Sequence, residues 1–212
     1  MKPSLDLSLY LVLDPGLCGD YGMVATTRDA VAAGATVVQL RMKQASTQER
    51  IEMGRALKQV TDGSRARLII NDDVVAAVAI DADGVHVGQA DDRPPFVRQM
   101  IGPDKILGLS VDSLDVADRI DPALIDYIGA GPVFATATKP NHAPPVGFEG
   151  LAEMIRRAKV PTVGIGGLNA AHVEATLATG ADGIAVVSAI CGTPDPAEAT
   201  RALAAAIAKA RS

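Results

Sequence analysis

Short apolar runs alternate with helical patterns along the whole chain. Eight runs have the length and composition of buried strands, at 8–13, 35–40, 67–70, 84–87, 106–109, 124–128, 161–165 and 183–187. Helical segments follow them at 27–33, 47–60, 74–80, 94–101, 114–120, 148–158, 170–178 and 195–209. This alternation predicts an α/β protein with a parallel sheet and right-handed crossovers. Eight such units favour a closed (β/α)8 TIM barrel, with an open doubly wound sheet as the alternative.

Composition supports one such barrel over residues 1–212. Apolar residues make up 48% of the chain and aromatic residues only 3%, so the core must consist of aliphatic side chains, as in a helix-covered parallel sheet. The net charge is −5 and no basic cluster occurs, which argues against a nucleic-acid partner. Cys18 and Cys191 have no metal-ligand spacing, and we expect them to be small packed residues.

No targeting or membrane segment is expected. The apolar run 7–13 is short and lies between Asp6 and Asp14, unlike a signal peptide, and no run is long enough to span a bilayer. We therefore expect a cytoplasmic protein with no membrane partner. The sequence does not decide between a monomer and a homo-oligomer.

Polar residues gather where the expected strands end, which is where barrel enzymes carry their chemistry. After the second strand, alternation places Gln39, Arg41 and Lys43 on one side of the chain. Two cations and an amide suit an anion such as a diphosphate. A strand end fraying into solvent is the plainer alternative.

Two further strand ends carry acidic residues. Asn71, Asp72 and Asp73 follow the third strand, where an N-cap for the next helix is the competing interpretation. Asp91 follows the fourth strand, in the neighbouring loop. Because carboxylates are hard oxygen ligands, Asp72 and Asp91 beside a phosphorylated substrate suggest Mg²⁺.

The stretch 129–140 combines a glycine- and proline-rich break with Thr136, Thr138 and Lys139. The two threonines point the same way in an extended segment, and the three side chains together suit phosphate oxygens. A polar loop with one solvated lysine is the alternative. Glycine-rich or small-residue turns also follow the seventh and eighth strands, at 164–167 and 186–189, where barrels often hold a phosphate.

The histidines and one serine carry little weight alone. We expect His86 to be a hydrogen-bonded core imidazole and His172 to lie on an outer helix. His142 falls in the long loop, where it could approach a substrate, but nothing in the sequence fixes it there. Ser110 offers a hydroxyl at the end of the fifth strand.

Taken together, these strand ends resemble the thiamine phosphate synthase family. The similarity covers nearly the whole chain and lies in the segments 39–43, 71–73, 83–89, Asp91, Ser110, 131–139, 164–167 and 187–190. No single segment is decisive, but their joint presence in order is specific. The family is a (β/α)8 barrel, in agreement with the strand count.

The resemblance implies a reaction between two phosphorylated small molecules. A hydroxymethylpyrimidine diphosphate and a thiazole phosphate would condense to thiamine phosphate through a pyrimidine carbocation, releasing pyrophosphate. Position by position, it implies that the pyrimidine diphosphate is bound by Gln39, Arg41, Lys43, Asn71, Ser110 and Lys139. It implies Mg²⁺ on Asp72 and Asp91, and the thiazole phosphate on Thr136, Thr138, Gly167, Val187 and Ser188. Arg41, Lys43 and Lys139 would stabilise the charge of the leaving diphosphate.

Two positions depart from the family pattern. Ala135 stands where the family usually has proline, and Asp112 adds a negative charge after Ser110 or else caps the next helix. Three other functions compete: a thiazole tautomerase-like paralogue, a non-catalytic phosphate-binding module and a sugar-phosphate epimerase-type barrel. The full diphosphate and metal set argues against the first two, and the third lacks its histidine and aspartate cluster.

Overall fold

The eight expected strands close into a barrel in chain order. The computed structural model describes residues 4–138 and 143–212. Its strands are β1 (Leu9–Leu13), β2 (Val37–Leu40), β3 (Arg67–Asn71), β4 (Gly84–Val87), β5 (Ile106–Val111), β6 (Tyr127–Ala130), β7 (Thr162–Ile165) and β8 (Gly183–Val186). Each strand pairs in parallel with the next, and β8 pairs with β1. The expected TIM barrel is confirmed, and the open-sheet alternative is wrong.

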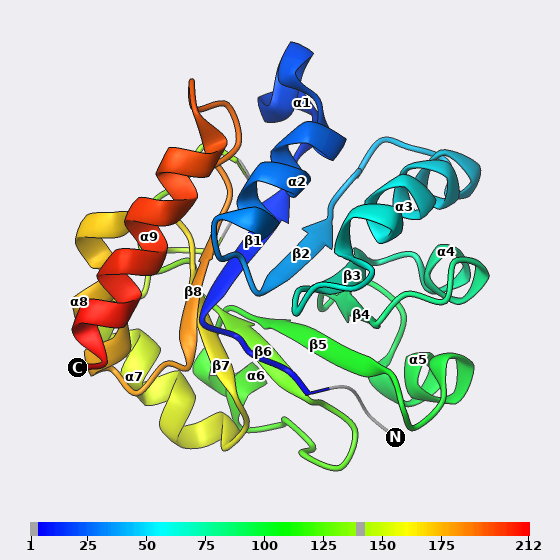
Figure 1. The fold of residues 1–212 in the computed structure, drawn as a ribbon. Helices are drawn as coiled ribbons and strands as arrows, with labels where there is room; N and C mark the ends of the chain where they lie inside the picture. The colour runs from blue at the N-terminus through cyan, green and yellow to red at the C-terminus, as the bar shows by residue number, and fades with distance from the viewer. Residues whose placement is uncertain (1–3, 139–142) are drawn as a thin grey trace.

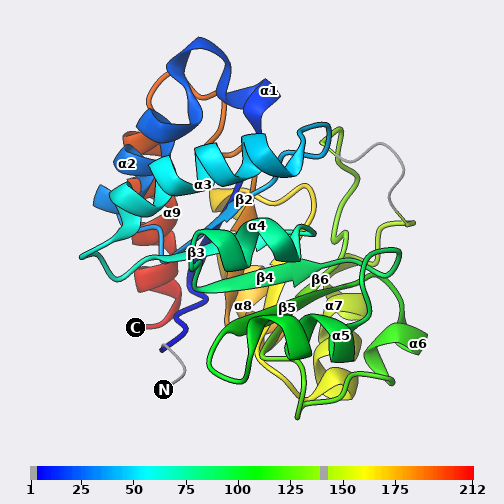
Figure 2. The same ribbon diagram turned by 90° about the vertical axis from the view of Figure 1, so that its right-hand side faces the viewer.

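Helices form an outer ring around the strands (Figures 1 and 2). They are α1 (Pro15–Cys18), η1 (Gly19–Tyr21), α2 (Met23–Ala32), α3 (Thr47–Thr61), α4 (Val74–Ala79), α5 (Pro94–Ile101), α6 (Leu114–Ala117), α7 (Gly147–Ala158), η2 (Ala170–His172), α8 (Val173–Ala178) and α9 (Pro196–Ala210). The C-terminal helix α9 packs beside α2, so the two ends of the chain complete the ring (Figure 1). Within the described residues, no helix is long and apolar enough to cross a membrane.

The structure departs from the expected elements at several places. The first helix, expected over 27–33, spans Met23–Ala32, and the helix expected over 114–120 ends at Ala117. The sixth strand begins at Tyr127 rather than Leu124, because the amides of Leu124 and Ile125 both bond to Asp121 O in a turn. The short helix α1 was not expected; the Asp14 carboxylate caps it and Pro15 opens it. The helix expected over 170–178 is split into η2 and α8.

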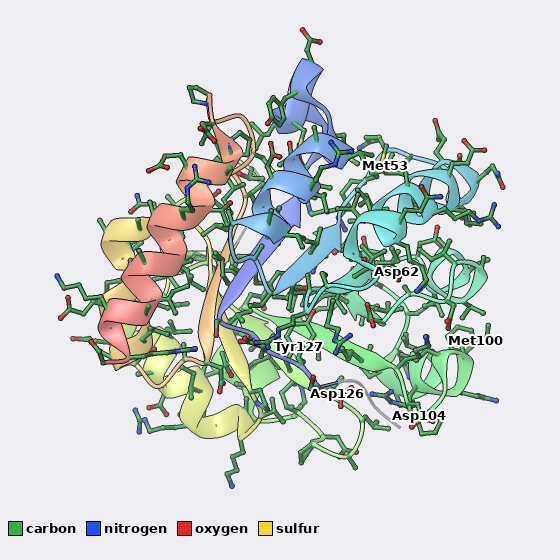
Figure 3. All side chains as sticks on the ribbon, in the orientation of Figure 1. Met53, Asp62, Met100, Asp104, Asp126 and Tyr127 are labelled. Carbon is green, nitrogen blue, oxygen red and sulfur yellow. The ribbon has the colours of Figure 1, made fainter. Side chains whose placement is uncertain are left out.

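Side chains of each strand alternate between two apolar layers. One layer packs against the helices, and the other, which includes Tyr10, Ile69, Ile106 and Tyr127, fills the barrel interior. Tyr127 lies within the barrel, whereas Met100 lies on the outer helix α5 (Figure 3). Gly108 makes room for the tyrosine ring: a Cβ there would lie 2.2 Å from Tyr127 Cζ.

Three aspartates secure the end of the barrel where the strands begin. Asp83 Oδ2 accepts from Leu68 N, Asp126 Oδ2 from Leu107 N, and Asp182 Oδ2 from Thr162 N, at 2.7–2.9 Å. Each aspartate directly precedes a strand and binds the amide of the strand before it. These contacts hold neighbouring strands together at the end of the barrel where the strands begin. The opposite end, where the strands stop, is the end at which barrel enzymes carry their active sites.

Candidate active site

A cavity of about 420 Å³ opens where the strands end. Its walls include all of the predicted site residues that the structure describes: Gln39, Arg41, Lys43, Asn71, Asp72, Asp91, Ser110, Thr136, Thr138, Gly167, Val187 and Ser188. Lys139 and His142 lie outside the described residues. The strand-end loops therefore bring together side chains that are up to 149 positions apart, from Gln39 to Ser188.

One wall of the cavity is cationic and is held in place by neighbouring ion pairs. Arg41 Nη1 donates to Asp14 Oδ2 at 3.3 Å, and the other oxygen of Asp14 caps α1. Lys43 Nζ contacts Asp72 Oδ2. Because each has a carboxylate partner, the guanidinium group of Arg41 and the ammonium group of Lys43 are oriented. Both residues still line the cavity.

Arg50 on α3 supports the loop that carries these cations. Its Nε and Nη2 donate to Met42 O at 3.1 and 2.9 Å, and its Nη1 donates to Asp73 Oδ2 at 3.0 Å. Asp73 Oδ1 in turn accepts from Ala76 N and caps α4. The N-cap interpretation is thus confirmed for Asp73, whereas Asn71 and Asp72 face the cavity.

Asp72 and Asp91 form a carboxyl pair at the cavity wall. Asp72 has a left-handed backbone (φ 63°), and its amide donates to His86 O at 2.8 Å. Asp91 Oδ2 accepts from Gly88 N at 2.7 Å. Burial and a hydrogen bond with Asp91 raise the pKa of Asp72 despite the nearby Lys43. Burial opposes ionisation of Asp91 too, but hydrogen bonds from Asp72 and Gly88 N hold its pKa below the usual value.

This donor set fits a small hard cation. Two neighbouring carboxyl groups can hold one divalent ion, and Mg²⁺ is typically bound by one or two carboxylates together with substrate phosphates and water. Among residues 4–138 and 143–212, no group of three or more His, Cys, Asp or Glu side chains is placed to hold a metal ion. Asp72 and Asp91 would therefore need ligand oxygens to complete the coordination.

The opposite wall is formed by the loops after β6, β7 and β8. Val133 N and Phe134 N donate to Ile165 O and Gly166 O at 2.8 and 3.0 Å, which ties the first two loops together. Gly167 has φ 65°, and a Cβ there would lie 2.8 Å from Ala135 O. Glycine is thus required for this close approach of two backbones. The wall carries hydroxyl groups and backbone but no cation among the described residues that line it.

A chain of buried polar side chains runs along one side of the cavity. Gln39 Nε2 donates to Tyr10 Oη at 2.7 Å, and Tyr10 Oη lies 2.6 Å from Tyr127 Oη. His86 Nδ1 lies 2.9 Å from Tyr127 Oη, and His86 Nε2 lies 2.9 Å from Ser110 Oγ. All five side chains line the cavity.

Comparison with known proteins shows the family to which the chain belongs. The family model of thiamine monophosphate synthase matches residues 9–190. The chain belongs to the thiamine monophosphate synthase family. It is 51% identical over 203 residues to the thiamine-phosphate synthase of Solidesulfovibrio magneticus and 47% identical over 204 residues to that of Laribacter hongkongensis, with 96% of each chain covered. Thiamine phosphate pyrophosphorylase from Pyrococcus furiosus has the same fold, with a TM-score of 0.88, 38% identity and 98% of both chains covered.

Membership of the thiamine monophosphate synthase family gives the chain an enzymatic activity. It is a transferase with thiamine-phosphate synthase activity and acts in thiamine biosynthesis on small molecules. The resemblance drawn from the strand ends is confirmed at the level of the family.

Sequence reasoning missed the tyrosines of this family member. Tyr10 and Tyr127 were assigned only to apolar strands, yet both residues line the cavity. A buried tyrosine usually needs a hydrogen-bond partner, and two of the three tyrosines fall within strands; this is the signal that could have found them. His86 is a hydrogen-bonded imidazole as expected, but it also contacts the cavity.

Other expectations about single residues have mixed outcomes. Ser113 caps α6, so the capping interpretation of Asp112 is wrong, and Asp112 lines the cavity. His172 lies on an outer helix as expected, at the end of the 3-10 helix η2, and its ring centroid lies 5.0 Å from that of Phe134. Cys18 and Cys191 are both buried, as expected.

Proposed function

We propose that this enzyme condenses 4-amino-2-methyl-5-(diphosphooxymethyl)pyrimidine with 4-methyl-5-(2-phosphooxyethyl)thiazole, giving thiamine phosphate and pyrophosphate. The observation that carries the proposal is that two walls of one cavity differ in their chemistry. Cations and a carboxyl pair occupy the wall after β2, β3 and β4, and hydroxyl groups with glycine turns occupy the wall after β6, β7 and β8. Two substrates, one with a diphosphate and one with a single phosphate, fit this division.

We propose that the cationic wall binds the pyrimidine diphosphate. Gln39, Arg41, Lys43, Asn71 and Ser110 contact it, with Lys139 as a further contact from the sequence pattern. As the bond to the diphosphate breaks, negative charge grows on the leaving oxygens, and Arg41, Lys43 and Lys139 stabilise that charge. Preorganisation favours this role, because Asp14 already orients Arg41 and Arg50 already fixes the loop of Lys43.

The proposal assigns Mg²⁺ to Asp72 and Asp91. When bound, the ion would neutralise diphosphate charge as the leaving group departs. Hydrogen bonds from Asp72 and Gly88 N hold the pKa of Asp91 below its usual value despite burial, which suits a cation. Burial raises the pKa of Asp72, and a bound ion would favour its ionised form. Lys43, which contacts Asp72, would then turn to the diphosphate.

Thr136, Thr138, Gly167, Val187 and Ser188 are proposed to hold the thiazole phosphate. The tie between the β6 and β7 loops places Thr136, Thr138 and Gly167 on one rigid surface. Departure of diphosphate would leave a carbocation that the pyrimidine ring stabilises, and the thiazole nitrogen would attack it. The walls of the cavity would hold the two reactants in line and exclude water from the cation.

The test is release of pyrophosphate by the purified protein, measured with both substrates, with each alone, and with and without Mg²⁺. Release that needs both substrates and the metal is the expected result. Release from the pyrimidine diphosphate alone would mean hydrolysis rather than condensation. No release, with thiazole phosphate still bound, would instead favour a tautomerase-like enzyme or a phosphate-binding module.

A further inference from the structure

One chain of hydrogen-bonded side chains has a role that substrate contact alone does not explain. It consists of Gln39, Tyr10, Tyr127, His86 and Ser110. Tyr10 and Tyr127 are fully buried, and burial raises the pKa of both phenols above the ordinary value. Both therefore keep their protons at any pH at which the protein works. Each phenol proton needs an acceptor, because a buried hydroxyl group without one is costly.

The acceptors follow from the first link of the chain. Gln39 presents Nε2, which can only donate, to Tyr10 Oη. The proton of Tyr10 therefore goes to its other partner, Tyr127 Oη, 2.6 Å away. Since Tyr127 Oη accepts from Tyr10, its own proton goes to His86 Nδ1, 2.9 Å away.

The same reasoning fixes the state of the imidazole. A neutral imidazole has one nitrogen that donates and one that accepts. With Nδ1 as the acceptor, the ring proton lies on Nε2, and Nε2 donates to Ser110 Oγ at 2.9 Å. The hydroxyl proton of Ser110 is then directed away from the imidazole, and the Ser110 side chain faces the cavity.

We infer that His86 is a positioning residue: it holds its ring proton on Nε2, donates to Ser110, and so presents the Ser110 hydroxyl to a ligand as a hydrogen-bond donor. The direction of this donation is set at Gln39 on β2 and is passed through the two tyrosines. Both ring nitrogens of His86 have hydrogen-bond partners within the protein in this arrangement.

The donor role of Ser110 also determines which kind of ligand atom it can bind. Ser110 as a donor favours an acceptor with a lone pair, such as an unprotonated nitrogen of a heteroaromatic ring; this consequence rests on the proposed function. Gln39 at the other end of the chain also faces the cavity. One ligand ring could thus bind both the Gln39 amide and the Ser110 hydroxyl, which are the two ends of the same hydrogen-bonded chain. A change at one of these contacts would then affect the other.

The tautomer is tested directly by nitrogen-15 NMR of the full-length protein labelled at histidine, with His86→Asn to assign the signals. Long-range proton–nitrogen correlations should show His86 protonated on Nε2. In Tyr127→Phe the acceptor interaction at Nδ1 loses its donor, and this preference should weaken. Protonation on Nδ1 in the unaltered protein would mean that the chain runs in the opposite direction and would overturn the inference.

A double-mutant cycle tests the positioning role. His86→Leu and Ser110→Ala should each lower kcat/KM for the pyrimidine diphosphate, and His86→Leu should change it by less than about twofold when Ser110 is already alanine. His86→Gln, which retains an amide donor, should recover part of the loss. Val85→Ala is the matched control, because Val85 is buried beside His86 on β4 but packs in the outer layer.

The outcomes separate the two claims. Val85→Ala should have the same effect in both backgrounds. If His86→Leu is just as damaging without the Ser110 hydroxyl, His86 acts only as core packing, and the positioning role is wrong. If the unaltered protein releases no pyrophosphate, the proposed function fails, whereas the tautomer is still decided by NMR.

Discussion

Arg50 Nη1 lies 3.0 Å from Asp73 Oδ2, and the same guanidinium donates twice to Met42 O. One side chain thereby joins the loop after β2, which carries Lys43, to the loop after β3, which carries Asp72. The cationic wall and the carboxyl pair are positioned by a residue that does not itself line the cavity.

Arg50→Lys should therefore lower kcat/KM about 10-fold. An ammonium group cannot make the several contacts of a guanidinium at once, so the two loops would be held less firmly. Steady-state kinetics with both substrates would measure the effect. Arg55→Lys, on an exposed position of the same helix, is the control and should leave kinetics unchanged. Equal kinetics for both variants would show that Arg50 has no positioning role.

Asp91→Ala should lower turnover at least about 100-fold, since a metal ion at the leaving group contributes several kcal/mol of charge stabilisation. The dependence of rate on Mg²⁺ concentration should weaken, while circular dichroism shows an intact fold. Asp92→Ala removes the neighbouring exposed carboxylate and serves as the control. A variant of Asp91 with ordinary kinetics would remove this residue from the site.

Lys43→Ala should raise the KM for the pyrimidine diphosphate about 10-fold or more, the magnitude of a lost hydrogen bond to a charged group. The KM for the thiazole phosphate should change little. Lys105→Ala removes a lysine at the end of the barrel where the strands begin, where Lys105 pairs with Asp81, and should affect neither constant. A selective loss of thiazole phosphate affinity would mean that the two pockets are exchanged.

Gly167→Ala should raise the KM for the thiazole phosphate, because the added Cβ would lie 2.8 Å from Ala135 O and push the two loops apart. Gly63→Ala is a matched control, with φ 79° and no atom within 4 Å of the added Cβ. Both variants should lose about 1–2 kcal/mol of stability from the left-handed backbone, measured by urea unfolding. If both leave the KM unchanged, the loop contact does not shape the pocket.

Asp126→Ala should reduce stability by about 2–4 kcal/mol and leave kcat/KM unchanged. The substitution strips Leu107 N of its acceptor and leaves Arg98, partly buried, without its carboxylate at 2.8 Å. Asp126 lies at the lower end of the barrel in Figure 3, where β6 begins and away from the cavity. Urea unfolding and steady-state kinetics, run on the same preparation, would show whether stability and activity separate as expected.

The sequence alone favoured the barrel and predicted many of the residues at its mouth, but not the two tyrosines. Strands of a parallel barrel are buried on both faces, so each appears as a mainly apolar run, and eight such runs followed by helices leave few topologies. Alternation within an extended segment was enough to place Gln39, Arg41 and Lys43 on one side, and these three do line one cavity. These are properties of neighbours in the chain.

Only the tertiary structure decided which of these groups interact with one another. The shared hydrogen bond of Asp72 and Asp91, and the contact of Lys43 with Asp72, depend on how neighbouring strand ends are staggered. The chain from Tyr10 through Tyr127 to His86 joins residues far apart in sequence, on the strands β1, β6 and β4, which are not neighbours in the barrel. No local pattern encodes such a juxtaposition, because closure of the barrel creates it.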